Sequence, residues 1–328
     1  MGFLRVNMQP LDIASAPPIP PALALHDSPE SVPSSLSRFS HETGPVVIMV
    51  HGYKFAPGDQ AHCPHEHILS PDPKHTCRKA KSWPRTLGAD GQTPDLLGIA
   101  FGWQARGTIW QAYDQAAQAG RALAKLVQMI RHTMPHRPVH AIAHSLGARV
   151  ILSALPHLRA GSINRALLLA GAEYHAQASS ALESPAGRCV EIFSITSREN
   201  TLYDHLFETL IPSQTSNDKI IGRMPPVAQN WMTVPIDDAE TLIALNTYGY
   251  RVAPRRTRVC HWSSYTRPGV FDLYQALLCK ERPLALNTLR AMLPTPHRSK
   301  PQWHRLSRHW RGMRNVQNTL TLPKIFSG

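Results

Sequence analysis

The stretch "VHAIAHSLGARVILSAL", residues 139–155, decides the fold. Its first part, 139–143, is a short apolar run typical of a buried strand, and residues 146–158 have the apolar spacing of a helix. Ser145 lies between the two, with Ala143 and Gly147 two positions away on either side. Small residues at these positions let a strand and a helix pass closely around a sharp turn. The stretch therefore predicts a strand, a tight turn that carries a serine, and a helix.

The same alternation continues on both sides of this stretch. Apolar runs predict further strands at 46–51, 96–103, 163–172, 189–196 and 231–237. Apolar residues that recur every three or four positions predict helices at 109–132 and 270–278. Strands that alternate with helices and are apolar on both faces predict an α/β fold, with a mostly parallel sheet and helices on both faces.

Composition divides the chain into three parts. Residues 1–43 are rich in Pro and Ser and predict a flexible lead-in, and residues 44–281 carry the α/β domain. Within that domain, residues 53–95 contain many His, Pro and Lys and little periodicity, which indicates a lid or a pocket wall. Residues 282–328 form a basic tail, since nine basic residues and no acidic residue follow Glu281.

The tail accounts for most of the net charge of +13. Its apolar side chains recur at spacings of three and four among basic residues, as in an amphipathic helix that could lie on an anionic membrane surface: Trp303, Leu306, Trp310 and Met313. The alternatives are a helix that packs on the body, a disordered tail and, less favoured, nucleic acid binding.

No apolar run is long enough to span a membrane. Five irregularly spaced cysteines indicate reduced thiols, and hence a cytoplasmic protein.

Three stretches supply residues for nucleophilic catalysis. Ser145 could act as a nucleophile if a base removes its proton, and His261 is the candidate base because it follows the last strand and precedes the last helix. Gly52, after the strand at 46–51, would free the backbone so that the amide of Tyr53 joins that of Leu146 in an oxyanion hole. The alternatives are a helix-capping serine, an ordinary glycine turn and a histidine satisfied within a loop.

The carboxylate that orients the base should follow the strand at 189–196. Glu199 is the choice because it comes soonest after the strand. Asp204 competes with it, but Asp204 falls on the face of a helix opposite the apolar stripe, and with Thr201 it has the spacing of a capping box.

The segment 62–77 contains side chains that can bind metals: His62, Cys63, His65, His67, His75 and Cys77. Their spacing matches no closed zinc site, so the segment is expected to form a pocket wall or lid, with metal binding as the alternative. Neither a metal nor any other cofactor is expected. The tryptophan at 83 could return the chain to the body of the fold.

By its motifs the chain resembles the α/β hydrolases, and in particular a group of bacterial serine hydrolases of uncharacterised substrate, classed as a domain of unknown function. The matching stretches are "VVIMVHGY", "IAFGWQARG", "AYDQA", "HAIAHSLGARVILSAL", "INRALLLAGA", "FSITSREN" and "CHWSSYTRPG". The resemblance implies the α/β-hydrolase fold, Ser145 as nucleophile, His261 as base, and transfer of an acyl group from a small-molecule ester to water. The chain departs from that group at the acid loop, where Asp is commoner than the Glu199–Asn200 found here. The alternative is a catalytically silent scaffold that binds a partner or a membrane.

Overall fold

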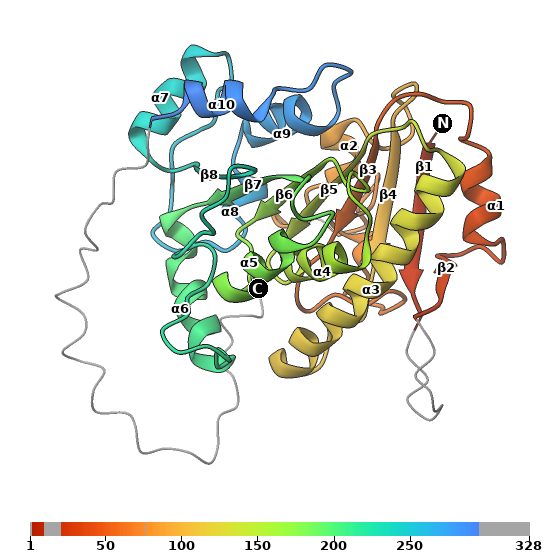
Figure 1. Cartoon of the computed structure of the whole chain (residues 1–328), viewed down its shortest axis with the longest axis horizontal. Coiled ribbons are helices and arrows are strands. Elements are labelled where there is room, and N and C mark those ends of the chain that lie inside the picture. Colours follow the sequence, from red (N-terminus) through yellow and green to blue (C-terminus); the bar gives the residue numbers. More distant parts are fainter. Residues whose placement is uncertain (1, 10–20, 76, 295–328) are drawn as a thin grey trace. The chain divides into compact units, whose positions relative to one another are not determined.

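Eight strands form a single sheet in the computed structural model, which describes residues 2–9, 21–75 and 77–294 (Figure 1). The order across the sheet is β2-β1-β4-β3-β5-β6-β7-β8, and only β2 runs antiparallel to its neighbour. The strands are β1 Gly2–Met8, β2 Leu23–Leu25, β3 Val46–Val50, β4 Leu97–Gly102, β5 Val139–His144, β6 Arg165–Leu169, β7 Glu191–Thr196 and β8 Trp231–Pro235. The mostly parallel sheet is confirmed.

Helices cover both faces of this sheet (Figure 1). One layer contains α1 Val32–Ser37, α3 Ile109–Thr133, α4 Gly147–Ala154, α5 His175–Glu183 and α6 Thr201–Leu210. The other contains α2 Trp83–Leu87, α7 Ala239–Thr247, α8 Ser263–Thr266, α9 Val270–Leu278 and α10 Leu286–Met292. Short 3-10 turns lie at Pro64–Glu66, Leu155–His157 and Arg198–Asn200. The α/β-hydrolase fold class predicted from the sequence is thus confirmed.

Each side of the sheet has its own apolar core, as expected for strands that are apolar on both faces. The core of the first layer joins Ile48 and Val50 of β3 to the long apolar stripe of α3, which includes Leu123 and Val127. The core of the second layer joins Met49 and its neighbours to α2, α9 and α10. Because successive side chains of a strand point to opposite faces of the sheet, β3 and β5 pack against both apolar cores. This packing fixes the positions of the turns that follow the two strands.

Residues 2–8 are not part of a flexible lead-in, so that prediction was wrong for this segment. They form β1, which pairs in parallel with β4 from Gly2 opposite Leu97 to Asn7 opposite Gly102. Leu4 and Val6 are buried, whereas Arg5 between them and Asn7 after them are only partly buried. This is the alternation of a strand with one covered face. Helix α1 also lies within the stretch predicted to be flexible.

The segment 53–95 is packed into the fold. Ile68, Leu69, Trp83 and Leu87 are buried in the core of the second layer, and the ring of Trp83 contacts that of Tyr265 with centroids 5.4 Å apart. The return of the chain to the body at this tryptophan is confirmed. Helix α10 extends the compact unit to Pro294, beyond the boundary predicted at 281. The amphipathic stretch from Trp303 to Met313 lies outside the described residues.

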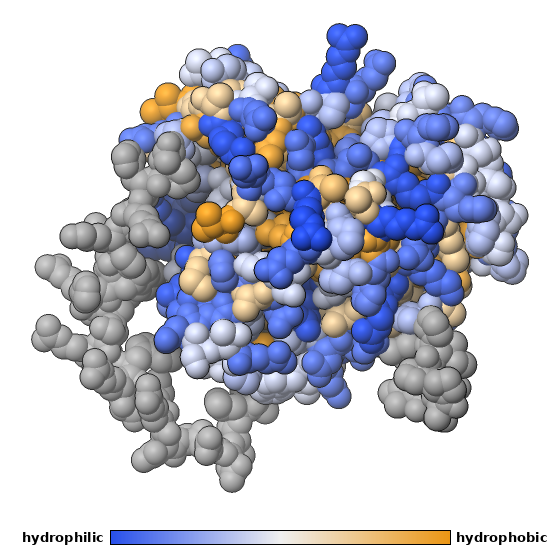
Figure 2. All heavy atoms as spheres, viewed as in Figure 1, coloured by the Kyte–Doolittle hydropathy of each residue, from blue (hydrophilic) through white to orange (hydrophobic). Residues whose placement is uncertain are grey.

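The surface seen in Figure 2 is mostly hydrophilic, with hydrophobic residues scattered singly or in small groups. Among the described residues, none of the helices combines the length and the apolar character that crossing a membrane requires. All five cysteines are free thiols.

Candidate active site

Ser145 occupies a strained turn between β5 and α4. Its φ is 55°, in the left-handed region that residues other than glycine rarely adopt. Three backbone hydrogen bonds hold it there: its N–H donates to the carbonyl of Leu169 at 3.0 Å, and its own carbonyl accepts from Ala148 and Ala172. Such strain costs on the order of 1–3 kcal/mol and persists only where its surroundings fix it, as they often do at functional sites.

Steric constraints explain why small residues surround Ser145. A Cβ on Gly147 would lie 2.7 Å from the carbonyl oxygen of His51 and 3.1 Å from the Cβ of Ala143. A Cβ on Gly52 would lie 2.7 Å from the carbonyl oxygen of His144 and 3.0 Å from the Cβ of Ser145. The turn after β3 and the turn after β5 therefore pass each other at a distance that side chains would prevent.

This close approach brings the candidate oxyanion donors to the same place. Gly52 and Tyr53 follow β3 after one intervening residue, His51, and the last residue of β3 pairs with Ala143 of β5. Leu146 stands at the start of α4, and within the described part of the chain its N–H donates no hydrogen bond. The hydroxyl of Tyr53 donates to the carbonyl of Gly107 at 2.8 Å, which ties the side chain to the loop after β4.

His51 is bound through both ring nitrogens and is not available as a base. Its Nε2 accepts from the N–H of Trp103 at 3.0 Å, so the proton is on Nδ1, which donates to the carbonyl of Gly52 at 2.9 Å. Burial lowers the pKa of His51 to about 4. The imidazole is therefore neutral, and it fixes the peptide group that precedes Tyr53.

His261 lies beside the turn that carries the serine. Its ring centroid is 4.5 Å from that of His144 and 4.6 Å from that of Tyr203, on which it stacks. The Nε2 of His144 lies 2.9 Å from the carbonyl oxygen of His261 and fixes the backbone of that residue. Burial, followed by the charges of His144 and Lys79, lowers the pKa of His261 well below its ordinary value, so the ring is neutral at pH 7.

The partner of His261 is an amide. The Oδ1 of Asn200 lies 2.6 Å from the Nδ1 of His261, and the Nδ2 of Asn200 donates to Asp204 at 2.8 Å. An amide whose nitrogen donates to a carboxylate must accept with its oxygen, so the Nδ1 of His261 carries the proton. The Nε2 of His261 is then an acceptor, as a general base requires.

Glu199, predicted to orient the base, does not contact the ring of His261. Its buried carboxylate binds the guanidinium of Arg267 and accepts from the hydroxyl of Thr257 at 2.8 Å. Burial alone would raise the pKa of Glu199, but the hydrogen bonds and the charge of Arg267 hold it below its ordinary value. Glu199 acts on the site through its backbone, because its carbonyl accepts from the N–H of Cys260, the residue before His261.

Asp204 is not the exposed capping residue that its helical position indicates. Only 7% of it is exposed, and a Cβ on Gly222 would lie 3.3 Å from its Oδ2, because the chain after α6 folds back over this face of the helix. The residue before α6 is Asn200, and the hydroxyl of Thr201 donates to the carbonyl of Arg198, so no capping box forms. Burial, with the charge of Glu208, raises the pKa of Asp204 to about 7.

The His- and Cys-rich segment 62–77 does not gather into a metal site among the described residues. Two of its histidines have other partners: His62 lies 3.3 Å from the carboxylate of Asp59, and the Nε2 of His65 lies 2.6 Å from the Oδ1 of Asn7. The Sγ of Cys77 is 3.4 Å from the Nε2 of His67.

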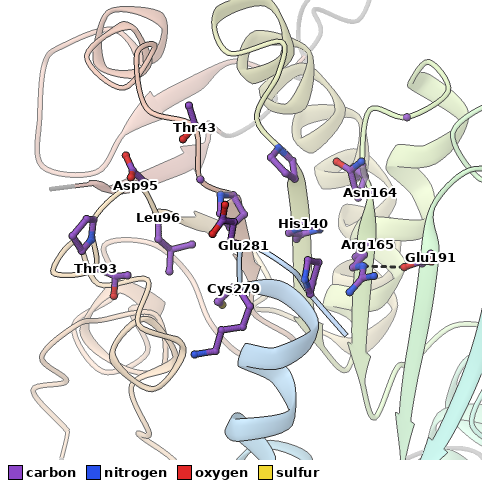
Figure 3. Close-up of a pocket in the computed structure, with 18 of the residues that line it drawn as sticks. Thr43, Thr93, Asp95, Leu96, His140, Asn164, Arg165, Glu191, Cys279 and Glu281 are labelled. Carbon is purple, nitrogen blue, oxygen red and sulfur yellow. Dashed lines mark ion pairs between the residues drawn. The ribbon is translucent and has the colours of Figure 1, made fainter. Parts of the chain in front are cut away.

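A cavity of about 830 Å³ lies at the opposite, amino edge of the sheet (Figure 3). His140, Arg165 and Glu191 line it in register on three neighbouring strands. Arg165 pairs with Glu191 at 2.8 Å and donates to the carbonyls of Leu277 and Leu284, which fixes the end of α9. None of the residues discussed above as nucleophile, base or orienting group lines this cavity, so it is separate from the candidate active site.

Comparison with known proteins agrees with the fold. Residues 29–170 match the family model described as alpha/beta hydrolase of unknown function (DUF900). The match includes Gly52 and Ser145 and ends before Asn200 and His261. A search of curated proteins found no match. The family match and the parallel sheet together show the α/β-hydrolase fold, and over residues 29–170 the chain is similar to a family whose function is unknown.

Proposed function

We propose that the protein is a serine hydrolase that cleaves a carboxylic ester through an acyl-enzyme. Ser145 is the nucleophile and His261 the base, and Asn200 with Asp204 orients the base. The observation that carries the proposal is the hydrogen-bond pattern at His261: its Nδ1 lies 2.6 Å from an amide oxygen, which leaves Nε2 free to accept a proton. The strained turn at Ser145, beside a neutral imidazole, is the second support.

In the first step the Nε2 of His261 takes the proton from the Ser145 hydroxyl while the oxygen attacks the ester carbonyl. The carbonyl oxygen becomes an oxyanion, for which the amides of Tyr53 and Leu146 are the proposed donors. The imidazolium then gives its proton to the departing alcohol, and the acyl group stays on Ser145. Water attacks this ester in the same way, with His261 again as base, and the acid leaves.

Asn200 and Asp204 share the work that one carboxylate does in most triads. The amide keeps the proton of His261 on Nδ1, and the carboxylate behind it keeps the amide in that orientation. Because the pKa of Asp204 is raised to about 7, its side chain is only partly ionised at neutral pH. Its negative charge also stands one side chain further from the imidazolium than in a direct pair, so it stabilises the imidazolium less. We expect a working site with a weaker base than a histidine–aspartate pair provides.

This departure also favours an alternative, a catalytically silent scaffold that binds a partner or a membrane surface. A fluorophosphonate probe separates the two functions, because it reacts only with an activated serine. Labelling of the wild-type protein but not of Ser145→Ala, followed by hydrolysis of at least one member of a panel of esters with graded acyl chains, supports the hydrolase. Absence of labelling in a folded wild-type protein supports the scaffold.

A further inference from the structure

The cavity at the amino edge of the sheet contains a histidine without a hydrogen bond. His140 of β5 is only 3% exposed and lines this cavity. Its Nδ1 is buried without a partner, and within the described residues its Nε2 forms no hydrogen bond either. Burial, then the charges of Arg165 and Arg131, lower the pKa of His140 to about 3, so the ring is neutral. It therefore has one N–H and one lone pair to offer to a polar group.

The state of His140 differs from that of the other buried histidines. In the part of the chain that the structure describes, each of the others has a polar neighbour for at least one ring nitrogen: His51, His65, His67 and His144. Buried polar groups are nearly always paired, because an unpaired one destabilises the folded state. A ligand in the cavity would supply the partner that His140 lacks.

Arg165 lies beside His140 and also has an unused nitrogen. The two residues are opposite each other on β5 and β6. The Nε of Arg165 pairs with Glu191, and its Nη1 donates to the carbonyls of Leu277 and Leu284. Within the described residues its Nη2 donates no hydrogen bond, although the side chain is only 9% exposed. Because three contacts fix the guanidinium, its two remaining N–H groups are oriented in advance for an oxygen acceptor such as a carboxylate.

Acidic side chains lie on the other side of His140. Figure 3 shows Asp95 and Glu281 on one side of this ring and Arg165 on the other. Asp95 and Glu281 are exposed, and among the described residues neither forms an ion pair. Arg137 donates to the carbonyl of Asp95 at 2.6 Å, which fixes the backbone there. The cavity thus has an acidic side and a basic side, and it matches a ligand that carries charges of both signs.

The cavity also has room for an apolar group. Its volume of about 830 Å³ falls in the range of about 300–1,000 Å³ that is usual for small-molecule sites. Leu96 and Ile163 are buried and line it together with four prolines. Lys280 lines it as well and offsets part of the negative charge of its three carboxylates.

We propose that this cavity binds a small zwitterion of the amino-acid type with an apolar side chain. The carboxylate of the ligand accepts from the Nη2 of Arg165 and from the ring of His140. Its ammonium lies toward Asp95 and Glu281, and its side chain packs on the apolar wall. The site is separate from the proposed active site, so its test does not depend on hydrolysis.

The first test compares L-leucine with two analogues that each lack one charge, N-acetyl-L-leucine and L-leucinamide. Each is titrated into the full-length wild-type protein in a calorimeter at low salt. L-Leucine should bind with a Kd on the order of 0.1 mM, as a ligand of this size can. Both analogues should bind at least about tenfold more weakly, because each leaves one charged contact unmade. The assignment of a zwitterion is overturned if L-leucine does not bind, or if either analogue binds as tightly.

The second test assigns the contacts to residues. His140→Leu removes the unpaired nitrogens and should weaken L-leucine binding at least about tenfold. The double variant Asp95→Asn/Glu281→Gln should weaken it about tenfold too, while the weak binding of N-acetyl-L-leucine, which has no ammonium, stays unchanged.

The double variant keeps the test decisive if His140→Leu does not fold. Both of its sites are exposed, and asparagine tolerates the φ of 60° found at Asp95. The matched control is Glu183→Gln, an exposed residue of α5 that does not line the cavity, and it should bind L-leucine as wild type does. Undiminished binding by the folded cavity variants would place L-leucine elsewhere and refute the site.

Discussion

Glu199→Gln should destabilise the protein severely while sparing the chemistry. Glu199 and Arg267 are 2% and 4% exposed, and the glutamine would leave the guanidinium buried without a counter-charge. Breaking a buried ion pair in this way costs about 3–5 kcal/mol. At about 2 °C of Tm for each kcal/mol in a domain of this size, Tm should fall by about 6–10 °C.

The assay is urea unfolding together with turnover at a temperature where the variant is folded. Turnover per folded molecule should stay within about tenfold of wild type, because the carbonyl of Glu199 still accepts from Cys260. The matched control is Glu66→Gln, which removes a carboxylate from the solvent-accessible pair with Lys74 and should leave the free energy of unfolding close to that of wild type. An unfolding free energy within about 0.5 kcal/mol of wild type, with turnover lower by orders of magnitude, would refute the reasoning and return Glu199 to the role of orienting acid.

Three further predictions concern the proposed triad and its support. Ser145→Ala and His261→Ala should each reduce ester hydrolysis by at least about a thousandfold, and the double variant should be little worse; additive losses would mean that the two do not act together. The double variant Asn200→Asp/Asp204→Asn brings a carboxylate into direct contact with His261, and this variant should be at least as active as wild type. Asn200→Leu should lose activity. An inactive double variant together with an active Asn200→Leu would exclude the proposed orientation of His261 by Asn200 and Asp204. Because the pKa of Asp204 is raised to about 7, its side chain holds a proton in the folded state between about pH 4 and 7, whereas the unfolded chain releases that proton. The free energy of unfolding should therefore fall by at most about 1.4 kcal/mol per pH unit over this range and level off above about pH 7. Urea unfolding of Asp204→Asn should lack this fall, and identical pH profiles for the two proteins would contradict the assigned burial.

The parts of the fold that could be predicted from the sequence are those whose pattern is local. The apolar spacing of α3 and of α9 needs no distant partner to be recognised, and the predicted ranges agree with the structure to within one residue. The turn at Ser145 was found for the same reason, since its strand, its small residues and its helix are consecutive. Strand β1 was missed because its partner β4 lies about 90 residues further along the chain and the Pro-rich stretch between suggested a flexible segment.

The groups around His261 could not be assigned from the sequence, because distant residues decide which neighbour each one faces. Glu199 and Asn200 are adjacent, and either could have reached the histidine. Arg267, which follows His261 by six residues, binds Glu199 and leaves Asn200 for the ring. The face of Asp204 was wrongly predicted as exposed because the periodicity of α6 does not reveal the segment near Gly222 that covers it. In each case the pairing is a choice among side chains that are distant in sequence.

The charge on His261 decides how strong a base the proposed site can offer. The hydrogen-bond partner of the ring is the amide of Asn200 and not a carboxylate, and burial lowers the pKa of His261 well below its ordinary value. The imidazolium formed during catalysis would therefore be stabilised less than in a direct histidine–aspartate pair. The double variant Asn200→Asp/Asp204→Asn would bring a carboxylate against the ring, so its activity relative to wild type measures how much the missing contact costs.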